Sequence, residues 1–389
     1  MNESAEGKRC IWIMAGESSG EAYGALLAER LWEQDADLVI RGMGATAMSE
    51  AGVDIIVDSS DLGIIGLVEV LKHYPMFRRI FWGLVERASR ERPDAVVLID
   101  YPGFNLRFAK QLHKLGITVI YYISPQVWAW GKRRIPVIAE VVDKMLTIFP
   151  FEPEAYAGTE LDVEFVGHPL LEVLAPYRER GIEREESTVL LLPGSRRSEV
   201  DRMLPVFVET SARLALERPD LNFVVAVPTG SVSGHVRGLL ASLVLAVPDC
   251  PHIGLVEGET REWLCRASVG IAASGTVTVE AAILGLPLVV AYRLNVLTFA
   301  LLRRLVKIPY FTMVNLVAEG LVYPEFLQGD ANPGTLSRAL VQLLPGEPER
   351  VGAEEGMALA VSRLAGRSDV CKRAAQAVIG TMEAKAEAD

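Results

Sequence analysis

The chain has 389 residues, 50% of them hydrophobic, and 33 glycines, so it is too long for one ordinary hydrophobic core and we expect two domains of similar size. Its formal net charge of −11 excludes general nucleic-acid binding, because the phosphate backbone requires a basic surface. The four cysteines are scattered and form no Cys-x-x-Cys pair, which argues against a disulfide framework or a zinc site and fits a reducing cytosol.

No segment is expected to cross a bilayer. Every long apolar stretch is interrupted by Glu, Arg, Lys or Pro, and the apolar run 10–15 is too short for the core of a signal peptide. We therefore expect a cytoplasmic protein.

Short apolar strands alternate with helical patterns along the chain, which predicts an α/β fold with two parallel sheets and right-handed crossovers. The predicted strands are 10–14, 37–40, 95–99, 118–122, 144–148 and 164–166 in the first half, and 189–192, 222–227, 253–255, 269–273 and 288–291 in the second. The highly charged segment 175–188 has little that could be buried and is interpreted as an interdomain linker. The expected parts are 1–175, 188–345 and a helical end, 346–389, which packs back on the first domain.

Two strand-to-helix loops in the first half carry carboxylates. Asp100 follows the apolar strand 95–99 and precedes Pro102 and Gly103, so it lies at the carboxyl end of the sheet, where a buried carboxylate can accept a proton from a sugar hydroxyl. Glu17, with Ser18 and Ser19, occupies the first crossover loop and can hold acceptor hydroxyls. The alternative for both loops is helix capping.

An aromatic segment in the first half predicts a lipid-docking surface. Residues 64–68 and 76–82 are crowded with bulky apolar side chains, including Phe77, Phe81 and Trp82, and residues 72–92 hold six Lys or Arg against two Glu. Apolar wedges beside basic residues suit an anionic lipid surface. A buried amphipathic helix is the alternative. Residues 297–311 could extend the same surface.

Two further loops, in the second half, predict a nucleoside diphosphate site. Gly194, Ser195 and Arg196 follow one buried strand, and Ser274, Gly275 and Thr276 follow another. Backbone N–H groups at such helix starts bind phosphate, and a guanidinium matches phosphate oxygens two at a time. Glu280 lies one helical turn beyond Thr276, within reach of a ribose. A plain N-cap beside a surface Arg is the alternative.

Neither a metal nor a cofactor is assigned. The Asp35-Ala36-Asp37 triplet resembles the metal motif of some sugar transferases, but it precedes a strand rather than following one. His168 is compatible either with the site or with a hydrogen-bonded structural role.

Several motifs in one order resemble lipid-A-disaccharide synthases across nearly the whole chain. They include residues 15–20, 66–73, 99–105, Ser-Pro-Gln-Val-Trp-Ala-Trp at 124–130, Phe-Pro-Phe-Glu at 149–152, 166–170, 192–196, 274–280 and 324–328. The resemblance implies a GT-B fold of two Rossmann-like domains facing a central cleft. It also implies inverting transfer from UDP-2,3-diacylglucosamine to 2,3-diacylglucosamine 1-phosphate, giving lipid A disaccharide 1-phosphate and UDP, at the cytoplasmic face of a Gram-negative inner membrane.

The resemblance also implies roles for individual residues. It points to Asp100 as the base, Arg196 as the diphosphate clamp, Glu280 as the ribose partner, and Asn315 and Gln328 as further site residues, while Asn105 joins the acceptor side. The expected partners are the two lipid-linked sugars and the anionic inner-membrane surface, and a homodimer is left open. A UDP-N-acetylglucosamine 2-epimerase-like isomerase, another UDP-sugar lipid transferase and a catalytically silent nucleotide-sugar binder are the alternatives.

Overall fold

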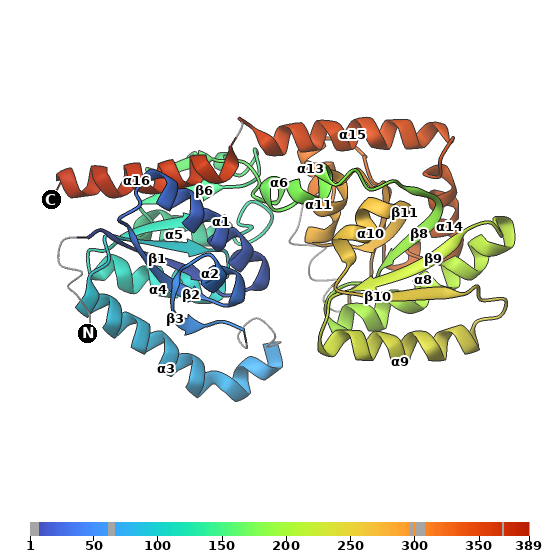
Figure 1. Ribbon diagram of the computed structural model, residues 1–389, viewed down its shortest axis with the longest axis horizontal. Coiled ribbons are helices and arrows are strands. Elements are labelled where there is room, and N and C mark those ends of the chain that lie inside the picture. The colour runs from blue at the N-terminus through green and yellow to red at the C-terminus, as the bar shows by residue number, and fades with distance from the viewer. Residues whose placement is uncertain (1–7, 61–66, 296–298, 300–307, 368, 389) are drawn as a thin grey trace. The chain divides into compact units, whose positions relative to one another are not determined.

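The computed structural model describes residues 8–60, 67–295, 299, 308–367 and 369–388 (Figure 1). It divides the chain into two compact units, one formed by Met1–Val173 with Ala365–Asp389 and the other by Leu174–Leu364. Residues 64–66 and most of 297–307, which the sequence placed on the lipid-docking surface, lie outside the described residues.

The first unit contains a seven-stranded sheet in the order β3-β2-β1-β4-β5-β6-β7, with every pair of neighbours parallel. Its elements are β1 (Cys10–Ala15), α1 (Ser18–Gln34), β2 (Val39–Gly44), α2 (Thr46–Glu50), β3 (Asp54–Asp58), α3 (Leu67–Glu91), β4 (Ala95–Ile99), α4 (Pro102–Lys114), β5 (Thr118–Tyr122), η1 (Lys132–Arg134), α5 (Ile135–Val141), β6 (Lys144–Thr147), η2 (Pro153–Tyr156), β7 (Asp162–Phe165), α6 (Leu170–Val173) and α16 (Val370–Ala388).

The second unit contains a six-stranded parallel sheet in the order β10-β9-β8-β11-β12-β13. Its elements are α7 (Ala175–Glu179), β8 (Glu185–Leu192), α8 (Arg197–Glu217), β9 (Asn222–Val227), α9 (Ser231–Ala246), β10 (Ile253–Glu257), α10 (Thr260–Arg266), β11 (Ala267–Ala273), α11 (Thr276–Ile283), β12 (Leu288–Tyr292), α13 (Met313–Ala318), β13 (Glu325–Leu327), η3 (Gln328–Asp330), α14 (Pro333–Gln342) and α15 (Pro348–Ala365). The predicted α/β class and its two parallel sheets are confirmed.

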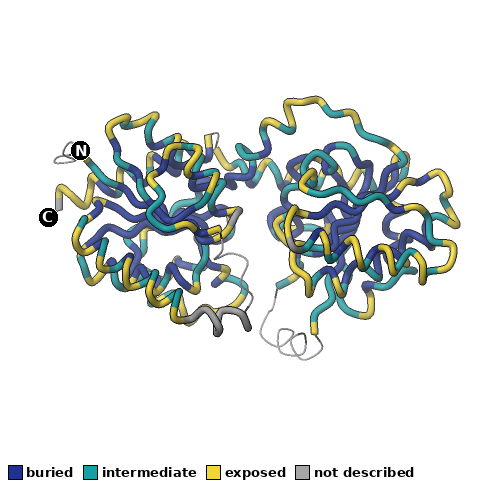
Figure 2. The backbone as a smooth tube through the Cα atoms, turned by 60° about the horizontal axis from the view of Figure 1, so that its bottom comes forward, coloured by how far each residue is buried: buried dark blue, intermediate teal, exposed yellow. Residues whose placement is uncertain are grey.

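The central strands are buried on both faces because helices cover each sheet (Figures 1 and 2). Every residue of β4, β5 and β11 is buried, which explains why these segments are continuous apolar runs rather than alternating ones. No helix within the described ranges is both long enough and apolar enough to cross a membrane.

The last helix belongs to the first unit. Helix α16 packs against α1 and the sheet strands β4 and β5, and it buries one apolar face made of Val370, Cys371, Ala374, Ala375, Val378 and Met382. Helix α15 remains with the second unit, where Met357 Sδ accepts a 3.1 Å hydrogen bond from Tyr323 Oη. The segment 346–389 is therefore divided between the two units.

The segment 175–188 is not a free linker, and that interpretation of its charges is wrong. It contains α7 and the first half of β8, and all of it belongs to the second unit. Arg184 donates to three backbone carbonyl groups, those of Leu264, Ala267 and Leu284. An arginine in a charged run can thus connect several backbone segments within one unit by hydrogen bonds, which composition alone does not reveal.

Candidate active site

The Asp100 loop is held in an uncommon backbone conformation at the carboxyl end of β4. Asp100 and Tyr101 both have φ of 45°, in the left-handed region. The Asp100 carbonyl oxygen accepts hydrogen bonds from Asn105 Nδ2 at 2.9 Å and Tyr121 Oη at 2.6 Å. Asn105 also donates to the Ile99 carbonyl and is fully buried. It therefore fixes the loop that presents Asp100, whereas the sequence placed it among the acceptor contacts.

Glu17 and Asp100 come together because their strands are neighbours. Ala15 at the end of β1 pairs with Ile99 at the end of β4. The Tyr101 ring closes the loop over Gly16, where a Cβ would lie 2.4 Å from Tyr101 Cδ1, so no larger residue fits there. Glu17 is exposed and its side chain makes no capping hydrogen bond, which removes the capping alternative for this carboxylate. Ser18 opens α1, and Ser19 is exposed in its first turn.

The Asp100 carboxyl group has the protonation behaviour of a base that works near neutral pH. Burial, and then the neighbouring Glu17 carboxylate, raise the pKa of Asp100 from 3.8 to about 6, while the Tyr101 backbone N–H opposes that rise. A carboxylate with this pKa is ionised at pH 7 and is more basic than an ordinary aspartate, which suits proton abstraction from a hydroxyl.

Sequence reasoning missed a second acid, Glu152, and left His168 open. Glu152 is 2% exposed, and its Oε2 accepts hydrogen bonds from the backbone N–H groups of Ile148 and Phe149 at 3.1 and 3.0 Å. Burial raises the pKa of Glu152 to about 8. Burial also lowers the pKa of His168 to about 3, and its Nδ1 accepts a hydrogen bond from the Leu170 N–H, so this neutral histidine has a structural role. The Phe-Pro-Phe-Glu motif was the available signal for Glu152.

In the second unit the two predicted phosphate loops lie at the same edge of the sheet, because Leu192 in β8 pairs with Ala272 in β11. Gly194 has φ of 114°, and a Cβ there would lie 2.6 Å from Glu199 Oε2, so the first loop requires glycine. The Glu199 carboxylate accepts hydrogen bonds from the backbone N–H groups of Ser195 and Arg196 at 3.2 and 3.3 Å. A carboxylate therefore already occupies N–H groups that can bind an anionic ligand.

Arg196 extends from this loop into solvent. Its side chain is 73% exposed, and Nη1 lies 3.3 Å from Glu199 Oε1. Burial raises the pKa of Tyr292 at the end of β12; the Glu199 carboxylate adds to that rise and the Arg196 guanidinium opposes it, so β12 ends near the same loop. This exposed ion pair is weak, so the guanidinium can reorient toward a phosphate at little cost.

The second loop is open above its glycine. Gly275 precedes α11 in extended conformation, and a Cβ at this position would contact nothing within 4 Å. Ser274 is partly exposed, and Gly275 and Thr276 are exposed. The Gly275 carbonyl accepts a 2.8 Å hydrogen bond from Thr278 Oγ1. Glu280 lies on the next turn of α11 and forms an ion pair with Arg261 Nε at 3.1 Å. Burial raises the pKa of Glu280, and Arg261 opposes that rise.

Asn315 and Gln328 form hydrogen bonds to other residues of the second unit. Asn315 is fully buried; its Nδ2 donates to the Tyr323 carbonyl and to Glu325 Oε1, and its Oδ1 accepts from the N–H groups of Val322 and Tyr323. Its amide is saturated, so a ligand could bind it only by displacing one of these bonds. Gln328 follows β13 and makes two hydrogen bonds to the backbone of Leu294, at 2.7 and 3.2 Å.

The three aromatic residues of α3 have different surroundings. Phe77 and Phe81 are partly buried and pack against the core of the first unit, where the Phe81 ring lies 5.5 Å from Phe104 and 6.1 Å from Phe108. Trp82 is 50% exposed and lies beside Arg78 and Arg79, which are also exposed. The exposed part of the predicted lipid surface is therefore Trp82 with these two arginines.

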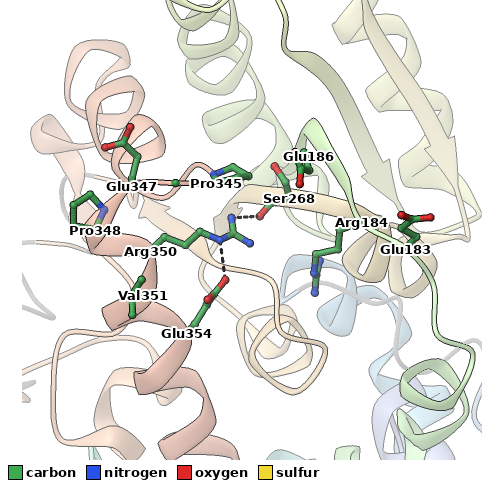
Figure 3. Close-up of a pocket in the computed structure, with 11 residues that line it drawn as sticks. Glu183, Arg184, Glu186, Ser268, Pro345, Glu347, Pro348, Arg350, Val351 and Glu354 are labelled. Atoms are coloured by element: carbon green, nitrogen blue, oxygen red, sulfur yellow. Dashed lines mark hydrogen bonds and ion pairs between the residues drawn. The ribbon is translucent and has the colours of Figure 1, made fainter.

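A pocket in the second unit lies away from these loops, at the amino ends of β8 and β11 (Figure 3). Two of its arginines serve the fold: Arg184 through its three carbonyl partners, and Arg350 through the carbonyls of Ser268 and Leu343 and an ion pair with Glu354. Because open α/β sheets bind ligands at the carboxyl ends of their strands, we assign no substrate to this pocket.

Comparison with known proteins identifies the family. A family model described as lipid-A-disaccharide synthetase matches residues 11–379. The lipid-A-disaccharide synthase of Syntrophotalea carbinolica is 36% identical over 374 residues, which cover 94% of this chain and 93% of that protein. That of Koribacter versatilis is 37% identical over 386 residues, which cover 96% of this chain and 99% of that protein.

Solved structures agree on the architecture. A UDP-GlcNAc 2-epimerase from Neisseria meningitidis bound to UDP-GlcNAc superposes with a TM-score of 0.64 at 13% identity, covering 96% of this chain and 100% of that one. The glycotransferase of kitacinnamycin superposes with a TM-score of 0.63 at 15% identity, covering 96% and 99%. At these identities the likeness shows the fold alone, which is GT-B. The sequence matches go further: the chain belongs to the lipid-A-disaccharide synthase family, hexosyltransferases of lipid A biosynthesis that use a UDP-sugar.

Proposed function

We propose that this chain transfers diacylglucosamine from UDP-2,3-diacylglucosamine to 2,3-diacylglucosamine 1-phosphate, with inversion at the anomeric carbon. The observation that carries the proposal is the Asp100 loop. It presents a partly buried carboxylate with a pKa of about 6 at the carboxyl end of β4, beside Glu17, and Asn105 and Tyr121 hold the loop through the Asp100 backbone carbonyl. Such a group is suited to remove a proton from an alcohol at neutral pH.

In the proposed reaction the acceptor hydroxyl oxygen attacks the anomeric carbon of the donor. The hydroxyl proton passes to the Asp100 carboxylate, and the bond between the anomeric carbon and the diphosphate oxygen breaks, so that UDP leaves with the bonding electrons. Attack opposite the leaving group gives inversion, with the acceptor sugar in place of the water used by inverting hydrolases. Glu17 contributes by keeping Asp100 basic.

The second unit supplies the groups for the leaving UDP. Arg196 and the N–H groups of residues 195 and 196 stabilise the negative charge that develops on the diphosphate, and Ser274, Gly275 and Thr276 bind its other phosphate oxygens. When UDP binds, its diphosphate takes the place of the Glu199 carboxylate, which in the structure accepts hydrogen bonds from the N–H groups of Ser195 and Arg196. Glu280, oriented by Arg261, accepts a ribose hydroxyl. Asn315 and Gln328 position this edge of the sheet rather than bind the ligand.

We further propose that the protein works on the cytoplasmic face of the inner membrane and docks through the exposed surface of α3. Trp82 supplies an apolar anchor, and Arg78 and Arg79 attract anionic headgroups. The lipid tails of both substrates make such docking useful, because the acyl chains need not leave the bilayer entirely.

The test is an incubation of purified protein with radiolabelled UDP-2,3-diacylglucosamine and the phosphorylated acceptor in neutral detergent micelles. We expect equimolar disaccharide 1-phosphate and UDP, with a new linkage of inverted anomeric configuration. An epimerised donor would instead support the isomerase alternative, and unchanged donor would support the silent binder.

A further inference from the structure

A run of three cations lies on the first unit, in the turn η1 that precedes α5. Lys132, Arg133 and Arg134 are all exposed, and within the described part of the chain none of their side chains has an ion pair or a hydrogen bond. The Arg134 guanidinium lies over the Trp130 ring, with its Cζ 5.6 Å from the ring centroid. The Trp130 side chain is itself 52% exposed. We refer to residues 130–134 as the basic turn.

The backbone holds the basic turn in a defined conformation. The Trp130 N–H donates to the Gln126 carbonyl at 3.2 Å, and the Arg134 N–H donates to the Gly131 carbonyl at 2.8 Å. Gly131 has φ of 84°, which glycine adopts without strain. Helix α5 continues from the turn and anchors it through buried Ile138. Three cations are therefore carried by one ordered segment of backbone, which reduces the entropy lost when they bind a ligand.

The basic turn is connected to the proposed base. It follows β5, the strand that pairs with β4, and Asp100 is the residue directly after β4. Tyr121 in β5 donates its hydroxyl to the Asp100 carbonyl at 2.6 Å. Burial and then the Asp100 carboxylate raise the pKa of Tyr121, and the Arg134 guanidinium opposes that rise. Arg134 and Asp100 thus act electrostatically on the same phenol.

This position matches the chemistry of the acceptor. In the proposed function one sugar ring carries both the attacking hydroxyl and a phosphate monoester, so the phosphate lies within one sugar's length of the base. The base itself, Asp100, and its neighbour Glu17 are both carboxylates and repel a phosphate. Cations farther along the same domain are suited to hold it, because guanidinium groups bind phosphate with paired hydrogen bonds.

We propose that the basic turn binds the phosphate monoester of the lipid acceptor, with Arg133 and Arg134 on the phosphate oxygens and Trp130 against the sugar. The inference rests on the proposed function for the identity of the acceptor. An anionic lipid headgroup offers the same phosphate chemistry, but it would not depend on the acceptor's own phosphate. That difference separates the two sources experimentally.

The test compares the wild-type protein with the double variant Arg133→Ala/Arg134→Ala, using acceptors with and without the phosphate in neutral micelles. We expect the KM for the phosphorylated acceptor to rise by about 10- to 100-fold, the scale of one or two lost charge-assisted hydrogen bonds, with kcat changed by less than about 3-fold. The unphosphorylated acceptor should be used equally poorly by both proteins. Arg134→Lys keeps the charge and should recover part of the affinity.

The matched control is Lys110→Ala/Lys114→Ala on α4. These lysines are exposed in the same unit, and because α4 runs from the end of β4 back to the start of β5, Lys114 lies at the opposite edge of the sheet. This variant removes the same charge and should leave the KM unchanged. Equal losses in the control and in the basic-turn variant would overturn the proposal, since a general electrostatic effect would then explain both.

Two further measurements keep the inference separate from the proposed function. Calorimetric titration of a short-chain diacylglucosamine 1-phosphate, without donor, decides the phosphate site even if no disaccharide forms; equal affinity in wild type and Arg133→Ala/Arg134→Ala refutes it. Sedimentation with phosphatidylglycerol vesicles tests whether the basic turn binds the phosphate of a lipid headgroup instead. Lost vesicle binding with an unchanged acceptor KM would assign the basic turn to headgroups and overturn the proposal.

Discussion

Replacing Asp100 by asparagine should make the protein less active and more stable at the same time. Because burial and Glu17 raise the pKa of Asp100 from 3.8 to about 6, the folded state binds this proton more tightly than the unfolded state does. Ionisation of Asp100 therefore lowers the free energy of unfolding as the pH rises from about 4 to about 6, and the loss persists at pH 7. Asparagine cannot ionise, so the variant avoids this loss.

The size of the effect follows from the pKa shift. A rise of about 2 units corresponds to about 3 kcal/mol at 1.36 kcal/mol per unit, which is an upper limit because the asparagine amide must also be buried. We expect Asp100→Asn to gain about 1–3 kcal/mol at pH 7 and nothing below about pH 4. Transfer should fall by about 10²- to 10⁴-fold because the proton acceptor is lost. The wild-type kcat/KM should rise with pH through about 6.

Urea unfolding of wild type and Asp100→Asn at several pH values from about 3.5 to about 8, together with initial rates near neutral pH, measures both quantities. Asp249→Asn is the matched control, because Asp249 also has a positive φ, of 53°, but is exposed. Asparagine tolerates this backbone conformation at both positions. If the gain in stability of Asp100→Asn is absent at pH 7, or does not change with pH, the burial argument for its raised pKa is refuted.

Three more substitutions test other parts of the structure. Arg196→Ala should lower transfer by about 10²- to 10³-fold without changing the melting temperature, because its side chain is 73% exposed, and near-normal turnover would exclude it from the mechanism. Trp82→Ser should weaken sedimentation with anionic vesicles and leave the fold intact, and unchanged vesicle binding by this variant would refute docking through α3. Phe81→Ser should instead lower the free energy of unfolding by about 3 kcal/mol, because Phe81 packs against the core. Arg184→Ala should cost about 2–4 kcal/mol in urea unfolding, since three carbonyl groups lose a charged donor, while Arg178→Ala in the adjacent exposed helix should cost little.

The sheets could be predicted because buried parallel strands leave a plain signal. The segments 95–99 and 118–122 coincide with β4 and β5, and polar residues directly after such strands are confined to the carboxyl edge of the sheet. That rule is sufficient to place Asp100, Gly194 and Gly275 in loops at the carboxyl edges of the sheets, without any knowledge of side-chain contacts.

Residues whose surroundings depend on how the chain folds back could not be predicted. Asn315 is polar and suits a ligand contact, but its partners at residues 322–325 saturate it. The helical pattern of α3 does not say which apolar residues another helix covers, and α4 covers Phe81 through Phe104 and Phe108. Glu152 has no neighbour in sequence that predicts its burial.

The place of α16 in the first unit has a consequence for protein synthesis. The helix lies against α1, so segments from both sides of the second unit meet in one fold, with about 190 residues of that unit translated between them. On the ribosome the second unit can complete its core as soon as it emerges, but the face of the first unit that α16 covers stays exposed to water until α16 has been synthesised. Chaperones that bind exposed apolar surface would bind there, on the unit whose strands are translated before the second unit and whose last helix is translated after it.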